Sequence, residues 1–231
     1  MCGKFTAMAT WRQVVAFTQP LTMERYADAP PEDEREVSYR VISNLPVILW
    51  DRVGEFRRVV PMRWGFPDRQ DWRRPQPIHA RSERIKSTKA FAEAFLDGQR
   101  GIVLMKNFNE APDIEGPTIQ HTIAPGEDPA LAAAFVWRRF EIPGQAEPLF
   151  ACVLVTVPAN ALIATLPTDR MPAFLAPGDW RKWLGEEEAS VEELKACLKT
   201  VEGVRWTMSR EEVREKRPRR KPTASDPGGF F

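Results

Sequence analysis

Short apolar and alternating runs, each bounded by turn residues, dominate the chain, and runs of this kind predict β-strands. The predicted strands lie at 47–50, 56–60, 101–105, 118–123, 133–137 and 150–157. The first two flank Asp51–Gly54, a polar segment ending in glycine that predicts a turn. The chain therefore contains more predicted strands than helices.

Helical patterns are short and scattered between these strands. Thr10 is a candidate cap for a helix at 10–17, and Ser87 or Thr88 opens a helix through Phe95 that Gly98 closes. A third helix begins near Asp179, and a capping box begins a fourth at Ser190. Because helices and strands do not alternate regularly, we predict an α+β fold with a mainly antiparallel, barrel-like sheet flanked by short helices.

The length of 231 residues fits one domain with its own hydrophobic core. Residues 24–36 are acidic and contain two adjacent prolines, which predicts a loop. The composition changes near the C-terminus, where residues 210–221 carry seven basic side chains. We therefore expect a catalytic domain at 1–205 and a basic, flexible tail at 206–231, which is either a solvated terminus or an auxiliary nucleic-acid contact.

The rarer residue types exclude several classes of protein. Three cysteines without CxxC spacing argue against a disulfide framework, and two histidines cannot supply a His-rich metal site. No stretch approaches the ~18 apolar residues of a membrane span, and no secretory signal pattern opens the chain. We expect a monomer without metal or cofactor, located in the cytoplasm and associated with the nucleoid when bound to DNA.

Cys2 is the first residue that suggests chemistry. Because cysteine is small, we expect Met1 to be removed, which would leave a free amine and a thiol on one residue. The unperturbed amine titrates near pH ~7.7 and the thiol near ~8.5, so both are partly nucleophilic at cellular pH. Such a pair condenses with an aldehyde to a thiazolidine, or attacks an amide as N-terminal nucleophile hydrolases do.

Positive charge is concentrated in residues 52–89, although the whole chain has a net charge of only +1. This segment has eleven Lys or Arg residues against four Asp or Glu, and Trp64, Phe66 and Trp72 lie among them. Guanidinium groups bind phosphates and aromatic rings stack on bases, so the pattern favours single-stranded nucleic acid. A solvated charged surface over core tryptophans is the alternative.

Five strings, in order from residue 1 to about residue 184, match motifs of one known family. They read MCGKF at 1–5, PMRWGF at 61–66, ARSE at 80–83, GIVLMKNFNE at 101–110, and DRMP at 169–172 followed by WRKWL at 180–184. On these strings the chain is identified as a divergent member of the SOS response-associated peptidase (SRAP) family, and a prophage origin is compatible with that divergence.

The resemblance implies covalent capture of abasic sites in single-stranded DNA, as part of DNA repair and the SOS response. Cys2 would form a thiazolidine with the sugar aldehyde and shield the lesion, and the family name adds an autoproteolytic, peptidase activity. The catalytic residues implied or inferred are Cys2, Glu110, His79 and Thr168. The residues expected to contact DNA are Lys4, Arg63, Trp64, Phe66, Arg81, Arg84 and Arg170.

The departures from the family motifs concern the polar partners of the nucleophile. His79 stands where the family has Asn, Thr168 where it has His, Ala111 where it has Trp, and Lys4 where it has Arg. Thr168 cannot exchange protons near neutral pH, whereas His79 has an unperturbed pKa near ~6.5. We therefore hypothesise that proton transfer has moved from position 168 to position 79, with Glu110 assisting.

Two other functions are compatible with the same residues. One is a cysteine hydrolase that uses Cys2 as nucleophile and His79 as base. The other is a non-catalytic binder of single-stranded DNA that has lost the chemistry through the changes at 79 and 168.

Overall fold

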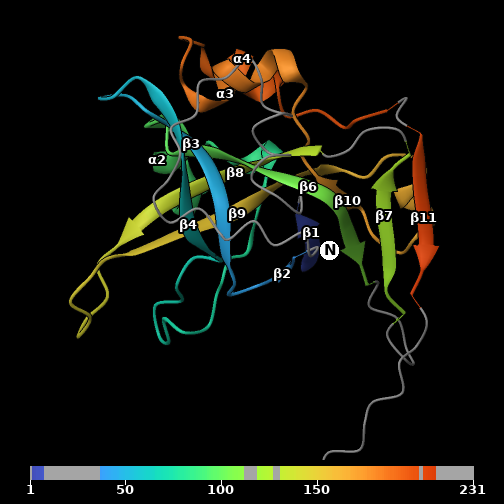
Figure 1. Cartoon of the computed structure of the whole chain (residues 1–231), viewed down its shortest axis with the longest axis horizontal. Coiled ribbons are helices and arrows are strands. Elements are labelled where there is room, and N and C mark those ends of the chain that lie inside the picture. Colours follow the sequence, from blue (N-terminus) through green and yellow to red (C-terminus); the bar gives the residue numbers. More distant parts are fainter. Residues whose placement is uncertain (1, 8–36, 112–118, 127–130, 203–204, 212–231) are drawn as a thin grey trace, which may run out of the picture.

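A computed structural model of the chain describes residues 2–7, 37–111, 119–126, 131–202 and 205–211 (Figure 1). The helix expected at 10–17, the loop at 24–36 and the tail after residue 211 lie outside the described residues.

Five strands close into a barrel. In chain order they are β3 (Asn44–Asp51), β4 (Phe56–Trp64), β6 (Arg100–Glu110), β8 (Leu131–Phe140) and β9 (Leu149–Pro158). Pairing runs β3–β4–β9–β8–β6, and β6 returns to β3 through the pair Ile48 and Ile102, which completes the ring. Every pair in this ring is antiparallel except β4 with β9.

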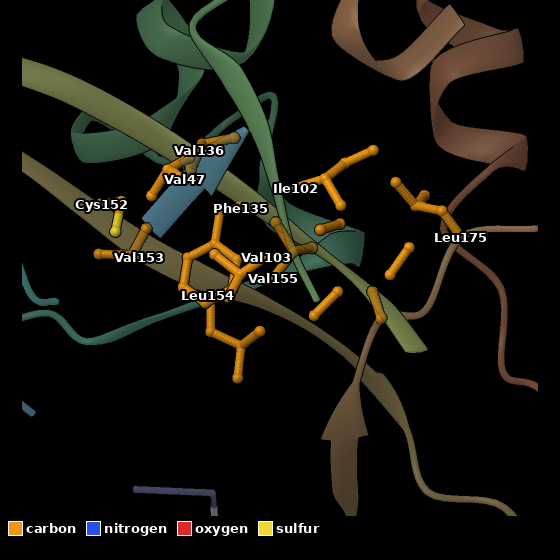
Figure 2. Close-up of a cluster of buried hydrophobic side chains, with 14 of the residues drawn as sticks. Val47, Ile102, Val103, Phe135, Val136, Cys152, Val153, Leu154, Val155 and Leu175 are labelled. Carbon is orange, nitrogen blue, oxygen red and sulfur yellow. The ribbon is translucent and has the colours of Figure 1, made fainter. Parts of the chain in front are cut away.

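The barrel interior is packed with apolar side chains. Figure 2 shows Val47, Ile102, Phe135 and Leu154 among the residues that converge from four of the strands, and these four are 0–2 % exposed. Cys152 lies in the same core, as expected from its apolar run in the sequence. Burial of this kind is the main contribution to the free energy of folding.

A second antiparallel sheet is built on the other half of β6. Its additional strands are β1 (Lys4–Ala7), β2 (Ser38–Arg40), β7 (His121–Pro125) and β11 (Trp206–Arg210). The order is β2–β1–β6–β7–β11, so β6 is the central strand, with β1 on one side and β7 on the other. β7 and β11 form the edge at the right of Figure 1.

Short elements surround these sheets. Strands β5 (His79–Arg81) and β10 (Arg170–Pro172) both pair with the C-terminal half of β9, the first in parallel and the second antiparallel. The α-helices are α2 (Lys89–Leu96), α3 (Trp180–Leu184) and α4 (Val191–Ala196), and the 3₁₀ turns are η1 (Ser82–Arg84), η2 (Ile163–Thr165) and η3 (Pro177–Asp179).

The α+β, barrel-like prediction is confirmed, and a strand is found at each predicted apolar run, although the one expected at 118–123 spans His121–Pro125. Ser190 and Glu193 form the predicted capping box, and Gly98 adopts a left-handed conformation after α2 with φ of 79°. The expected start of a flexible tail at 206 is wrong, because residues 206–210 pair with β7. The alternation of Trp206 and Met208 with polar residues is the pattern that indicates this strand.

Gly101 tests how tightly the barrel closes. A Cβ atom at this position would lie 2.5 Å from Cγ1 of Val47 and 3.1 Å from the carbonyl oxygen of Ile48, beside the single β3–β6 pair. We predict that Gly101→Ala lowers the free energy of unfolding by about 1–3 kcal/mol, since overpacking a rigid core forces backbone shifts. Gly178→Ala is the matched control, because nothing lies within 4 Å of its Cβ. Equal thermal midpoints in the two variants would contradict this.

Candidate active site around Cys2

Cys2 is held at the end of β6 that carries Glu110. Strand β1 pairs with β6 so that Lys4 lies opposite Asn109, which brings the residues before Lys4 beside Glu110. Cys2 is 3 % exposed, and its thiol donates a hydrogen bond to the carbonyl oxygen of Lys4 at 3.4 Å. Glu110 is fully buried. The nucleophile and the carboxylate predicted from the sequence therefore belong to one site.

The thiol of Cys2 stays protonated at neutral pH in this environment. Burial first, and then the negative charge of Glu110, raise the pKa of Cys2 to about 12, although backbone hydrogen bonds with Lys4 and Asn109 act in the opposite direction. The expectation of a partly ionised thiol at cellular pH is therefore wrong for this buried position. Attack by sulfur needs a base that removes the proton as the bond forms.

His79 contacts Cys2 directly. Nε2 of His79 lies 2.7 Å from the carbonyl oxygen of Cys2. Because a carbonyl oxygen can only accept a hydrogen bond, Nε2 carries the proton. β5 holds this histidine through parallel pairing with Leu154 of β9. The indole of Trp64 supports the same strand by donating to the carbonyl oxygen of Ile78 at 3.2 Å.

The environment of His79 changes the role expected for it. Burial lowers its pKa from 6.5 to about 4, and the hydrogen bond to the Cys2 carbonyl offsets this only in part. The imidazole is therefore neutral at pH 7, whereas the sequence-based hypothesis requires a pKa near 6.5. Thr168 donates its side-chain hydrogen bond to the carbonyl oxygen of Arg170 at 3.4 Å, and among the described residues no hydrogen bond joins it to Cys2.

A polar network behind β1 was not predicted. One carboxylate oxygen of Glu211 accepts from Lys4 at 3.2 Å, from Asn109 at 2.8 Å and from Thr122 at 3.0 Å. Burial opposes ionisation of Glu211, but these donors outweigh it and hold its pKa below the usual range. Lys4 is thereby engaged within the protein, so that its expected contact with DNA would compete with Glu211.

Two of the arginines expected to bind DNA are buried ion-pair or hydrogen-bond partners. Arg170 is 5 % exposed and forms two parallel hydrogen bonds to Glu83, at 2.6 and 3.0 Å. These bonds hold the pKa of Glu83 below its usual range. Arg63 is 6 % exposed, donates to the carbonyl oxygen of Trp72 at 2.7 Å and lies over its ring. Direct phosphate contacts by these two side chains are incompatible with this conformation.

The two aromatic residues expected along the DNA path are core residues. Trp64 is fully buried and packs against Phe5, while Phe66 is 3 % exposed and packs against Phe91 and Phe140. Neither ring can stack on a base in this conformation. Both rings therefore act on the site only through the strands that they support.

Arg81 and Arg84 are exposed as expected. Arg81 shares a face of β5 with His79, two residues or about 7 Å along the strand. Its nearest acidic group is Asp169, 3.9 Å away, and both side chains are more than half exposed. An exposed pair of this length contributes little to stability, so that Arg81 is available to a phosphate.

Other site types find no support in the described part of the chain. No group of three or more His, Cys, Asp or Glu residues there is arranged to hold a metal ion. Among the same residues, no helix is long and apolar enough to cross a membrane.

The sequence matches the family described as SOS response associated peptidase (SRAP) over residues 1–216, and the chain belongs to that family. The match extends past β11, in agreement with the folded position of this strand. A comparison with curated proteins finds no match.

Solved structures share the fold. A protein from Bacteroides thetaiotaomicron is 20 % identical with a TM-score of 0.75, covering 92 % of this chain and 93 % of the other. A protein from Bordetella bronchiseptica is 16 % identical with a TM-score of 0.72, covering 92 % and 100 %. A phage-related protein from the same organism is 17 % identical with a TM-score of 0.63, covering 91 % and 94 %.

The lowered pKa of His79 makes stability depend on pH. Because the unfolded chain binds the proton near pH 6.5 and the folded chain only near 4, stability is lost as the pH falls through this window. We predict that the free energy of unfolding of wild type, relative to His79→Asn, falls by about 1 kcal/mol per pH unit between pH 6.5 and 4. Urea unfolding at several pH values measures this difference, and parallel curves would contradict the buried neutral imidazole.

Proposed function

We propose that the protein captures abasic sites in single-stranded DNA by forming a thiazolidine between Cys2 and the sugar aldehyde. The observation that carries the proposal is the placement of Cys2 against Glu110 and His79 at the junction of the two sheets. Membership of the SRAP family supports DNA as the partner. Removal of Met1 is required, because only a free amine beside the thiol can close the ring.

The buried thiol favours a reaction that begins at the amine. The nitrogen of Cys2 attacks the aldehyde carbon to give a carbinolamine, which loses water to give an imine. The sulfur then bonds to the same carbon, and the thiol proton is transferred so that the ring nitrogen ends as a neutral secondary amine. The sum is one water released and one thiazolidine formed, which requires no ionised thiol beforehand.

Glu110 is the group placed to move these protons. Its charge already acts on the Cys2 thiol, so that it lies within electrostatic reach of the reacting atoms. Protonated, it would donate to the leaving hydroxyl of the carbinolamine; ionised, it would accept the thiol proton as sulfur attacks. His79 holds the Cys2 carbonyl through its Nε2–H, which orients the nucleophile for both steps.

The DNA backbone is proposed to follow the exposed face of β5. Arg81 projects from the same face as His79, and Arg84 is exposed one turn later in η1. A phosphate at Arg81 would replace the weak contact to Asp169. Arg170 would instead connect η1 to β9, through its bonds to Glu83 and to the carbonyl oxygen of Thr156.

A cysteine hydrolase is less favoured by this geometry. Such an enzyme needs its base hydrogen-bonded to the thiol. Here the thiol donates to the Lys4 carbonyl, and His79 Nε2 is bonded to the Cys2 carbonyl. A pure binder without chemistry would not require the nucleophile and carboxylate to be buried together.

Substitution of Cys2 tests the chemistry. We predict that the mature protein forms a band resistant to denaturing gel conditions with abasic single-stranded DNA, and that Cys2→Ala forms none. Cys2→Ala and Cys2→Ser both keep the amine, so an adduct of either variant should appear only after trapping with borohydride, which reduces the imine. Intact mass verifies that Met1 is absent from each protein.

Cys197→Ala is the matched control, because it removes another buried cysteine far along the chain. It should cross-link like wild type. A stable, untrapped adduct in Cys2→Ala would refute the proposed nucleophile, and a lack of any adduct in the wild type would refute the proposed function.

Substitution of two arginines separates DNA contact from structure. Arg81→Gln should weaken binding to single-stranded DNA and reduce the slope of log affinity against log salt by roughly 0.7, the value for one lost phosphate contact. Arg170→Gln should lower the thermal midpoint, because it removes the buried guanidinium that bonds both Glu83 and the carbonyl oxygen of Thr156. If the salt dependence of DNA affinity changed in Arg170→Gln and not in Arg81→Gln, the proposed path of the DNA backbone along β5 would be wrong.

A further inference from the structure

His121 lies beside Glu110 in the second sheet. The pairing register places it directly opposite Glu110 on β6 and directly opposite Arg210 on β11. Residues opposite each other in an antiparallel pair project from the same face, with Cβ atoms about 4.5–5.5 Å apart. Glu110, His121 and Arg210 therefore form one row across three strands.

The next row of residues on the same face of the sheet consists of core residues. This shows that the row of Glu110, His121 and Arg210 begins on the buried face. Phe108 lies opposite Ile123, and Ile123 opposite Met208. Phe108 and Ile123 are fully buried, so that Glu110 and His121, two residues away, face the same interior. Fully buried Glu110 is thus followed by a half-buried imidazole and then by an exposed guanidinium.

The His121 ring has a buried nitrogen and access to solvent. Its Nδ1 is buried and accepts or donates no hydrogen bond with any described residue, while the residue as a whole is half-buried. Among the described residues, the charged groups directly opposite it in the pairing register are Glu110 on β6 and Arg210 on β11. Cys2 precedes β1, which pairs with the other edge of β6, and the charge of Glu110 acts on its thiol.

We propose that His121 is the proton-exchange partner of Glu110, connecting the buried carboxyl group to solvent. A proton leaves the Glu110 carboxyl for Nδ1 of His121 while the proton on Nε2 passes to water, and the reverse sequence reloads the carboxyl. No bond other than N–H and O–H changes in this exchange. His121 acts through Glu110 and does not touch the substrate, so it is a positioning and proton-relay residue.

This inference rests on the proposed function in one respect, namely that Glu110 must be both protonated and ionised within one capture reaction. A carboxyl group with no exposed surface exchanges its proton slowly unless a titratable neighbour assists. Imidazole is suited to this because it titrates near neutral pH and has two nitrogens on opposite sides of the ring.

The first experiment needs no DNA and no cross-linking. The chain has two histidines, so His79→Asn leaves His121 as the sole source of histidine ring signals in an NMR titration. Adding Glu110→Gln should move the midpoint of that titration to lower pH, because a nearby carboxylate favours the imidazolium form. Adding Arg210→Gln should raise it. Glu141→Gln, at the distant β8–β9 connection, is the matched control and should leave it unchanged.

The second experiment measures cross-linking rates against pH. His121→Ala should slow cross-linking about tenfold at pH 7, and imidazole in the buffer should restore the rate, since it can carry the same proton. His121→Gln, which keeps a polar side chain, should be slowed similarly and should resist rescue. Thr207→Val on β11 is the control for a substitution in this sheet outside the row, and it should react like wild type.

The outcomes separate the two proposals. A wild-type protein that forms no adduct refutes the proposed function, while the NMR titration still decides whether His121 and Glu110 interact. A His121 midpoint that ignores Glu110→Gln overturns the inference. So does a His121→Ala protein that is folded and cross-links at the wild-type rate and pH dependence, even though abasic-site capture itself would then stand.

Discussion

The shared strand β6 is the constraint on which the site depends. Its first half closes the barrel through β8 and β3, and its second half carries β1 on one edge and β7 on the other. Because pairing register decides which side chains face one another, a slip of one residue would turn Glu110 away from Cys2. The rigid core of the barrel thus fixes the position of an N-terminal residue that has little structure of its own.

Burial divides the positively charged residues of this chain into two functions. Arg170, Arg63 and Arg57 are almost completely enclosed and bind carboxylates or carbonyls, with Arg57 paired to Glu186. Arg81 and Arg84 lie on the surface near the site. Only part of the concentration of basic residues in the sequence therefore lies on the surface. Much of it holds strands and turns together.

The sequence predicts the fold class well because strand period and caps are local signals, as β3, β4 and α4 illustrate. The sequence also predicts that Cys2, His79 and Glu110 belong to one site, because they lie in or beside motifs that follow the order found in the SRAP family. It could not predict the burial of Trp64 or Arg170, because exposure depends on which strands become neighbours of β9. The sequence did not predict that Glu110 and His121 lie side by side, for the same reason. The pairing register between two strands cannot be derived from either segment alone.

The bond between Lys4 and Glu211 joins the two ends of the described chain across the second sheet. During synthesis, Cys2 leaves the ribosome long before Glu211, which lies 209 residues later in the sequence. The N-terminal segment therefore lacks Glu110 and Thr122, which enclose it, until about half of the given sequence has been made, and it lacks Glu211, which fastens it, for much longer. Cys2 therefore reaches its 3 % exposure only after these groups have been made, and processing of the residues around it can precede the closure of the strand.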